Sequence, residues 1–124
     1  MDNAIRFAGV VVLFLCFAPG AMGEDSAVSG KEIAEKWVGK SAIGRTANGT
    51  PATVRLMADG TVTISSGSVT LDTGTWRAWD HGYCTTWRTI RAGQERCFST
   101  RRSGNIITVL NPDGSVSGTF DEIK

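Results

Sequence analysis

The residue types most capable of chemistry gather between residues 74 and 100. That stretch holds three of the four tryptophans, the single tyrosine, the single histidine and two of the three cysteines. Nucleophilic catalysis needs a nucleophile held in contact with a base, but His81 directly follows Asp80 in an expected turn that presents no nucleophile. One histidine and no Cys-x-x-Cys do not complete a usual zinc set. We therefore expect no enzymatic activity, no metal and no cofactor.

The first 23 residues have the features of a secretory signal peptide. Arg6 precedes an apolar run over residues 7–18, and Ala21-Met22-Gly23 places small residues where a cleavage site needs them. A membrane anchor is the alternative, but a helix that spans a bilayer needs about twenty apolar residues, more than this run offers. We predict a signal peptide over residues 1–23, a single domain over residues 24–124 with no membrane span, and a periplasmic or secreted location.

Cleavage at that point would remove Cys16 and leave Cys84 and Cys97 in an oxidising compartment. An even number of cysteines in a small secreted domain usually forms bridges, and two cysteines allow one pairing. We predict a Cys84–Cys97 disulfide. The loop that it closes would contribute about 3 kcal/mol in the chain-entropy model, a large share of the stability of a domain this small.

A short helix is expected first in the mature chain, after a polar and frayed segment over residues 24–28. Ser29-Gly30-Lys31-Glu32 has the form of a capping box, in which Glu32 also reaches back to the Ser29 amide. The apolar residues that follow recur at helical spacing and predict one buried stripe. They are Ile33, Ala34, Trp37 and Val38. Gly39 is a natural end for the helix.

From residue 41 onward the hydrophobic period changes from helical to two, and short turns such as Asp59-Gly60 separate the segments. The expected strands cover residues 41–46, 52–57, 61–66, 69–72, three segments within 74–100, then 105–110 and 115–120. Strands with apolar residues on one face only, joined by short turns, favour a closed barrel, because closure leaves no exposed sheet edge. We predict a mainly β fold, a small antiparallel up-and-down barrel of about eight strands, whose helix covers one mouth or edge. A β-sandwich is the competing architecture.

Alternation along the central strands predicts which side chains face inward. Tyr83 and Trp87 share a face, Phe98 joins them from the next strand, and Trp76 fits beside them from the preceding strand. The disulfide then lies on the outer wall. These four aromatic residues could line a cavity for an apolar or aromatic small molecule, entered opposite the helix, or could simply fill the core. Alternation does not separate the two possibilities.

The outer wall of the same strands carries a second set of residues that could bind a partner. They are Arg77, Trp79, Arg88 and Arg101. An aromatic side chain among arginines can bind a protein or an anionic polymer, but arginines also cover sheet surfaces without binding anything. The formal net charge is +1, so neither nucleic-acid nor membrane-surface binding is indicated.

Four motifs together resemble a family of small exported, single-disulfide, barrel-like proteins of α-proteobacteria to which no activity is assigned. They are Gly74-Thr75-Trp76, Cys84-x-x-Trp87, Cys97-Phe98 and Asp113-Gly114-Ser115. The resemblance implies a periplasmic or secreted single-domain protein. More loosely, the chain is similar to lipocalins and avidins, ligand-binding barrels that also use Gly-x-Trp, although lipocalins carry that motif on the first strand. In length and single disulfide it is also similar to bacterial metalloprotease inhibitors.

Three functional hypotheses follow. The first is a non-enzymatic exported barrel, expected to be a monomer, that binds a small apolar or aromatic ligand or an envelope component. The second is a protein-interaction module or protease inhibitor that uses the outer residues Arg77 and Trp79. The third is a structural envelope protein with neither ligand nor stable partner. A hollow interior would favour the first hypothesis over the others.

Overall fold

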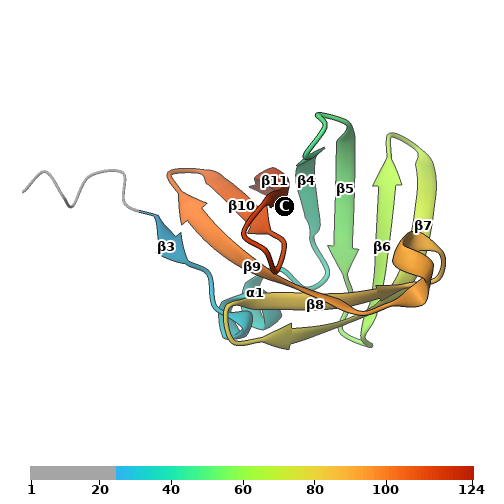
Figure 1. The fold of residues 1–124 in the computed structure, drawn as a ribbon, viewed down its shortest axis with the longest axis horizontal. Coiled ribbons are helices and arrows are strands. Elements are labelled where there is room, and N and C mark those ends of the chain that lie inside the picture. The colour runs from blue at the N-terminus through green and yellow to red at the C-terminus, as the bar shows by residue number, and fades with distance from the viewer. Residues whose placement is uncertain (1–24) are drawn as a thin grey trace, which may run out of the picture.

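The computed structural model describes residues 25–124, so the predicted signal peptide over residues 1–23 lies outside the described residues. Eight antiparallel strands form the body of the structure (Figure 1). They are β4 (Ser41–Thr46), β5 (Pro51–Leu56), β6 (Thr61–Ser66), β7 (Val69–Trp79), β8 (Gly82–Trp87), β9 (Arg96–Ser103), β10 (Ile106–Leu110) and β11 (Val116–Ile123). A short β3 (Ser26–Ala27), the helix α1 (Gly30–Lys36) and a 3-10 segment η4 (Ile90–Gly93) complete it.

The eight strands close into a barrel. Each strand from β4 to β11 pairs with the next one along the chain, and β11 then pairs with β4. Closure brings Phe120 opposite Gly44, so the last strand completes the ladder of the first. The prediction of a mainly β, antiparallel up-and-down barrel of about eight strands is therefore confirmed, and the predicted ranges 41–46 and 61–66 coincide with β4 and β6.

The turns have the residues that such tight connections require. In the β5–β6 turn the Asp59 carboxylate accepts a hydrogen bond from the Thr61 amide at 2.9 Å, and Gly60 has a φ of 91°. The β10–β11 turn repeats the arrangement, since Asp113 accepts from the Ser115 amide at 2.9 Å. A side-chain oxygen that holds the backbone two residues on fixes the hairpin.

The segment before the helix is ordered, contrary to the expectation of a frayed end. β3 pairs with β9 at Arg101 and Arg102, and Val28 is fully buried. The Val28 amide donates to the Thr100 carbonyl at 2.9 Å, and the Thr100 hydroxyl donates to the Val28 carbonyl at 2.8 Å. The sequence did not predict this order because the segment is held in place by backbone pairing with β9 and by the buried Val28, neither of which produces a periodic pattern of side chains.

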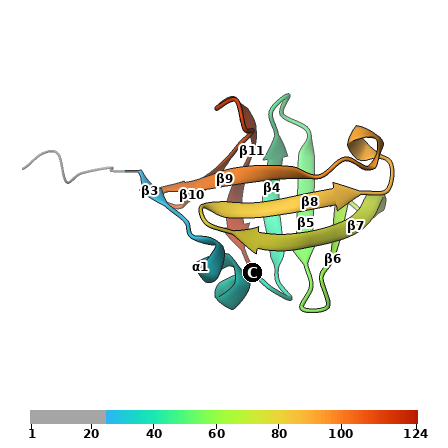
Figure 2. The same ribbon diagram turned by 60° about the horizontal axis from the view of Figure 1, so that its bottom comes forward.

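Helix α1 covers one end of the barrel, while η4 lies at the other end of β8 (Figure 2). The Ser29 hydroxyl accepts from the Glu32 amide at 3.1 Å, as the capping box predicts. The Glu32 carboxylate instead accepts from Arg102 of β9, at 2.5 Å, and this ion pair ties the helix to the barrel. A Cβ on Gly30 would collide with the Trp79 carbonyl oxygen, so only glycine lets the helix start this close to β7.

The buried stripe of the helix is narrower than predicted. Ile33 is fully buried and Trp37 is 4% exposed, whereas Ala34 faces solvent. The Trp37 ring meets Phe120 and Tyr83 edge-on, with ring centroids 5.9 Å and 6.4 Å apart. Two side chains from one short helix thus fill this end of the barrel.

Strand β7 is a single long strand, where two segments were expected. A bulge in its pairing with β6 places Ile64 opposite Asp72 and Ser65 opposite Thr70, which leaves Leu71 as the extra residue. The bulge shifts the alternation by one residue. Val69 and Leu71, which a regular alternation of apolar residues would place inside, are therefore 59% and 51% exposed, and Asp72 takes the buried position.

Candidate functional site: a cavity at the open end of the barrel

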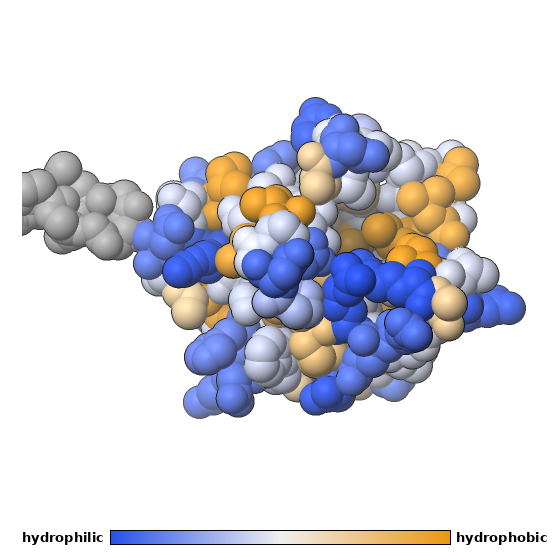
Figure 3. All heavy atoms as spheres, in the orientation of Figure 1, coloured by the Kyte–Doolittle hydropathy of each residue, from blue (hydrophilic) through white to orange (hydrophobic). Residues whose placement is uncertain are grey.

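The barrel contains a cavity of about 270 Å³ at the end away from α1. Apolar side chains from six strands and η4 line much of it. They include Ala52, Val54, Ile64, Tyr83, Trp87, Ile90, Phe98, Val109 and Phe120. Figure 3 shows a hollow in the face viewed, with apolar side chains inside it and strongly hydrophilic ones along its lower border. Ligand sites usually measure about 300–1,000 Å³, so this cavity suits a small ligand.

Three of the four aromatic residues singled out in the sequence border this cavity. Tyr83 and Trp87 on β8 and Phe98 on β9 are each less than a tenth exposed, and all three line the space. Tyr83 packs against Phe98 with ring centroids 5.6 Å apart. Burial raises the pKa of the Tyr83 phenol, which is already far above neutral pH in an ordinary tyrosine. The protonated hydroxyl can donate a hydrogen bond.

Trp76 is placed differently from the other three. It packs against the core from the inner side of β7 but is only partly buried and does not line the cavity. Its indole N–H donates to the Met57 carbonyl at 2.8 Å, in the turn between β5 and β6. This hydrogen bond holds the tryptophan at the helix-covered end. Trp76 therefore lies outside the set of residues that border the cavity.

The rim of the cavity includes η4, whose backbone is unusual. Arg91 and Ala92 have φ values of 57° and 54°, and Gly93 follows at 77°. A left-handed conformation costs a residue with a Cβ about 1–2 kcal/mol, and such strain persists where the surroundings enforce it, often at functional sites. The backbone here aims Arg91 at the cavity, since Arg91 and Ile90 both line it.

Asp72 enforces the conformation of this rim. One carboxylate oxygen of Asp72 accepts from the Thr89 amide at 3.0 Å, the Thr89 hydroxyl at 2.9 Å and the Ile90 amide at 2.9 Å. The other accepts from the Thr73 amide at 2.8 Å. These hydrogen bonds, led by the one from Ile90, lower the pKa of Asp72 to about 2. The buried carboxylate is thus a positioning group for the rim that carries Arg91.

The Arg91 guanidinium lies half-buried over the aromatic wall. Its central carbon is 5.2 Å from the centroid of the Phe98 ring, within the range of a cation–π contact. Its Nη1 atom is buried and has no hydrogen-bond partner within residues 25–124. Burial, and then the charge of Arg96, lower its pKa. No carboxylate in the described part of the chain forms an ion pair with it.

Thr85 is the second polar group without a partner at the cavity. It lies on β8 between Tyr83 and Trp87 and is 1% exposed. Its hydroxyl makes no hydrogen bond to any residue from 25 to 124, and the residue lines the cavity. A buried hydroxyl without a partner costs about 1–3 kcal/mol. Two residues that line the cavity, Arg91 and Thr85, therefore each carry a buried polar atom without a hydrogen-bond partner among residues 25–124.

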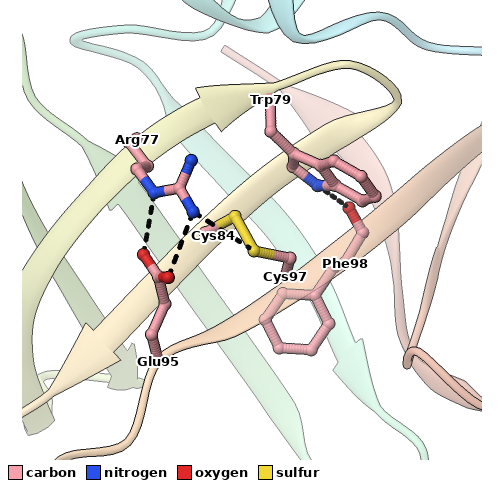
Figure 4. Close-up of a disulfide and its surroundings, with 6 residues drawn as sticks. All are labelled: Arg77, Trp79, Cys84, Glu95, Cys97 and Phe98. Carbon is pink, nitrogen blue, oxygen red and sulfur yellow. Dashed lines mark hydrogen bonds and ion pairs between the residues drawn. A yellow bond between two sulfur atoms is a disulfide. The ribbon is translucent and has the colours of Figure 1, made fainter.

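The predicted disulfide is present and lies on the outer side of the wall (Figure 4). Cys84 and Cys97 stand directly opposite each other in the β8–β9 ladder, and Cys84 is fully buried although it faces outward. The Arg77 side chain passes beside the disulfide and donates to both Glu95 carboxylate oxygens, at 2.8 Å and 3.1 Å. This ion pair raises the pKa of Arg77 and lowers that of Glu95.

The four residues proposed for a partner surface do not gather into one patch. Trp79 is part-buried, and its indole N–H donates to the Phe98 carbonyl at 2.9 Å. Arg77 is occupied by Glu95. Arg88 is exposed just beyond the end of β8 near the open mouth, whereas Arg101 is exposed on β9, paired with Ala27 of β3.

The sequence contained a clue to Thr85 but not to Arg91. Alternation places Thr85 on the inner face between two aromatic residues, and a polar residue at such a position indicates either a hydrogen bond or a ligand. Arg91 lies in a turn whose left-handed backbone is imposed by Asp72, a residue nineteen positions away. No local sequence pattern predicts the hydrogen bonds between Asp72 and this turn.

Comparison with protein-family models, with curated proteins and with solved structures finds no match for this chain. The resemblances to an α-proteobacterial family, to lipocalins and avidins and to metalloprotease inhibitors therefore stay predictions. What the structure defines is the class of fold, a small single-disulfide β-barrel. Within residues 25–124 no helix combines the length and apolar composition that a membrane crossing needs.

Proposed function

We propose that this protein is an exported, non-enzymatic binding protein whose barrel holds a small apolar or aromatic molecule in its open cavity. The observation that carries the proposal is the space of about 270 Å³ bordered by Tyr83, Trp87 and Phe98. A barrel whose aromatic residues only filled its core would leave no such space, since interiors pack to high density.

The volume of the cavity and the side chains that line it indicate the size and polarity of its ligand. A water molecule occupies about 30 Å³ of liquid, so the space suits a ligand of on the order of ten non-hydrogen atoms. The aromatic rings and the aliphatic side chains that line the cavity, such as those of Val54 and Val109, favour an apolar body. The disulfide is consistent with an oxidising compartment, as proposed from the predicted signal peptide.

Binding of small neutral molecules is the direct test. Phenylacetamide and octanamide would be titrated into the oxidised protein and followed by calorimetry and by tryptophan fluorescence, since Trp87 lines the cavity. We expect saturable binding with one site per chain. Native mass spectrometry of protein recovered from its own host compartment would add the bound molecule as extra mass. Absence of binding across such a panel, with only ligand-free protein recovered, would refute the proposal.

A variant with a filled cavity provides the control. Ala52 lines the cavity and is 7% exposed, so Ala52→Leu places three more carbon atoms in the space. We expect binding to weaken by at least about tenfold, while the melting temperature stays level or rises because a void is filled. Unchanged affinity in a folded Ala52→Leu protein would place the binding site elsewhere.

The protein-binding alternative receives less support from the geometry. Binding hot spots cluster at the centre of an interface, but Arg77 and Trp79 are held by contacts within the barrel, and Arg88 and Arg101 lie apart. A pull-down with the double variant Arg77→Ala, Trp79→Ala would still report on it, since lost recovery of a partner would favour this surface over the cavity.

A further inference from the structure

We propose that the ligand of the cavity is a small monocarboxylate with an apolar body, whose carboxylate binds Arg91 and the Thr85 hydroxyl. This inference rests on the proposed function and specifies the chemistry of its ligand. It starts from the two buried polar atoms that lack a partner within residues 25–124, Arg91 Nη1 and Thr85 Oγ1. Both residues line the same cavity.

A partner for these atoms is expected on energetic grounds. A buried donor without a hydrogen bond is destabilising, and a buried charge without a counter-charge is more so. In folded proteins such groups usually find a partner in the protein, in water or in a ligand. Thr85 is 1% exposed and lines the cavity, so the proposed ligand would approach its hydroxyl from the cavity side. A carboxylate would satisfy both groups at once, because it accepts several hydrogen bonds and neutralises one guanidinium.

The nearby acidic residues are already occupied. The Asp72 carboxylate is held by four donors from residues 73, 89 and 90. Glu95 is paired with Arg77 on the outer wall, and Asp113 accepts from Ser115 in its own turn. Arg96 adds positive charge beside Arg91. In the described part of the chain, the mouth therefore offers Arg91 no internal counter-ion.

The charge of the site favours a carboxylate over a phosphate. One inward guanidinium balances one negative charge, whereas a phosphate monoester carries about −1.5 to −2 at neutral pH. Arg45 also lines the cavity, but its guanidinium is exposed and donates to the Gly49 carbonyl at 3.1 Å. An aromatic or aliphatic body of about ten non-hydrogen atoms in total would then lie against Trp87, Phe98 and the aliphatic wall.

The test compares matched pairs of equal size and different charge. Phenylacetate would be compared with phenylacetamide, and octanoate with octanamide, by calorimetry at pH 7 with the oxidised protein. We expect the carboxylate of at least one pair to bind about tenfold more tightly than its amide, since charge-assisted hydrogen bonds exceed neutral ones by that order. The pair that binds better distinguishes an aromatic from an aliphatic body.

Variants of Arg91 assign the preference to a residue. Arg91→Gln should weaken binding of the carboxylate but not of its matched amide, so that the two affinities lie within about twofold of each other. Arg91→Lys should retain part of the preference for the carboxylate because it keeps the charge. Lys40→Gln removes the same charge from an exposed position beside the helix-covered end and should leave the preference intact. Circular dichroism of each variant checks that it folds.

Each alternative result is informative. If amides and carboxylates bind equally to the parent protein, the cavity binds ligands but the carboxylate inference is wrong. If neither binds, the proposed function fails and the inference fails with it. If the preference survives Arg91→Gln, or disappears in Lys40→Gln, Arg91 is not the residue that recognises the charge, and the inference is overturned.

Discussion

At the end of the barrel covered by α1, Ile33 and Trp37 fill the interior, whereas the end bordered by η4 keeps a cavity of about 270 Å³. The two ends also differ in whether their polar groups have partners. Glu32 and Arg102 satisfy each other beside the helix, but Arg91 and Thr85 each leave a buried atom without a partner among residues 25–124. One end obeys the rules for a stable core, and the other departs from them in a manner typical of binding sites.

The largest effect is expected from an identical substitution made at each end. Ile33→Ala removes the same atoms as Ile90→Ala, but Ile33 is fully buried in the filled end and Ile90 is partly exposed at the cavity rim. We expect Ile33→Ala to lower the free energy of unfolding by about 3 kcal/mol and Ile90→Ala by about 1 kcal/mol. Urea unfolding of both measures the difference. Equal losses would remove the contrast between the ends.

Removal of the disulfide should have an effect of similar size. Cys84→Ala with Cys97→Ala should cost about 3 kcal/mol relative to the oxidised parent, because the bridge restricts the unfolded chain. The reduced parent is the control and should unfold at nearly the same urea concentration as the double variant. A double variant as stable as the oxidised parent would show that the bond contributes nothing to stability.

A smaller effect of opposite sign is expected at Thr85. Thr85→Val keeps the shape of the side chain and removes the hydroxyl that lacks a partner. We expect stability to rise by about 1 kcal/mol, measured on ligand-free protein by urea unfolding. Thr100→Val is the matched control, because the Thr100 hydroxyl donates to the Val28 carbonyl at 2.8 Å, and its loss should be destabilising. A destabilised Thr85→Val protein would mean that the hydroxyl already has a partner.

The last prediction concerns the response to acid at the open end of the barrel. The pKa of Asp72 is lowered to about 2 by the hydrogen bonds from the η4 rim, below the value near 4 of an unfolded chain. The support that this carboxylate gives is therefore present above about pH 4 and is lost as the pH falls to about 2. In an NMR titration the Ile90 amide should shift with a midpoint near 2, and affinity for phenylacetamide should fall in the same range.

Asp72→Asn provides the control for that titration, since an amide group does not titrate. The shift of the Ile90 amide should disappear in the variant, and its affinity for phenylacetamide should be low at every pH. If the midpoint in the parent lies near 4, the carboxylate is not held by the rim as the structure describes.

Much of the fold could be predicted because its determinants are local. Period-two alternation, Asp-Gly turns and the capping serine are each encoded within a few residues, and they led to the barrel and to the helix. The pairing of Cys84 with Cys97 followed from the number of cysteines expected in the mature chain. The errors occur where a distant contact overrides the local pattern. The bulge beside Leu71 leaves Val69 and Leu71 exposed, and Glu32 turns away from the helix amide to reach Arg102.

The candidate site was predicted in its apolar half and missed in its polar half. Tyr83, Trp87 and Phe98 follow from alternation, which is a property of single strands. Arg91 depends on a backbone held by Asp72 from another strand, and no residue type in the turn requires that conformation. Whether the aromatic residues leave space between them depends on the packing of all eight strands together, which no single strand specifies.

The segment closed by the sulfur–sulfur bond, from Cys84 to Cys97, contains Thr85, Trp87 and Arg91. The disulfide therefore links the two strands on either side of the turn that carries the Arg91 guanidinium, and Asp72 accepts hydrogen bonds from residues in that turn. In an oxidising compartment the disulfide and the Asp72 hydrogen bonds both restrain this turn, whereas under reducing conditions only the hydrogen bonds from residues 89 and 90 remain.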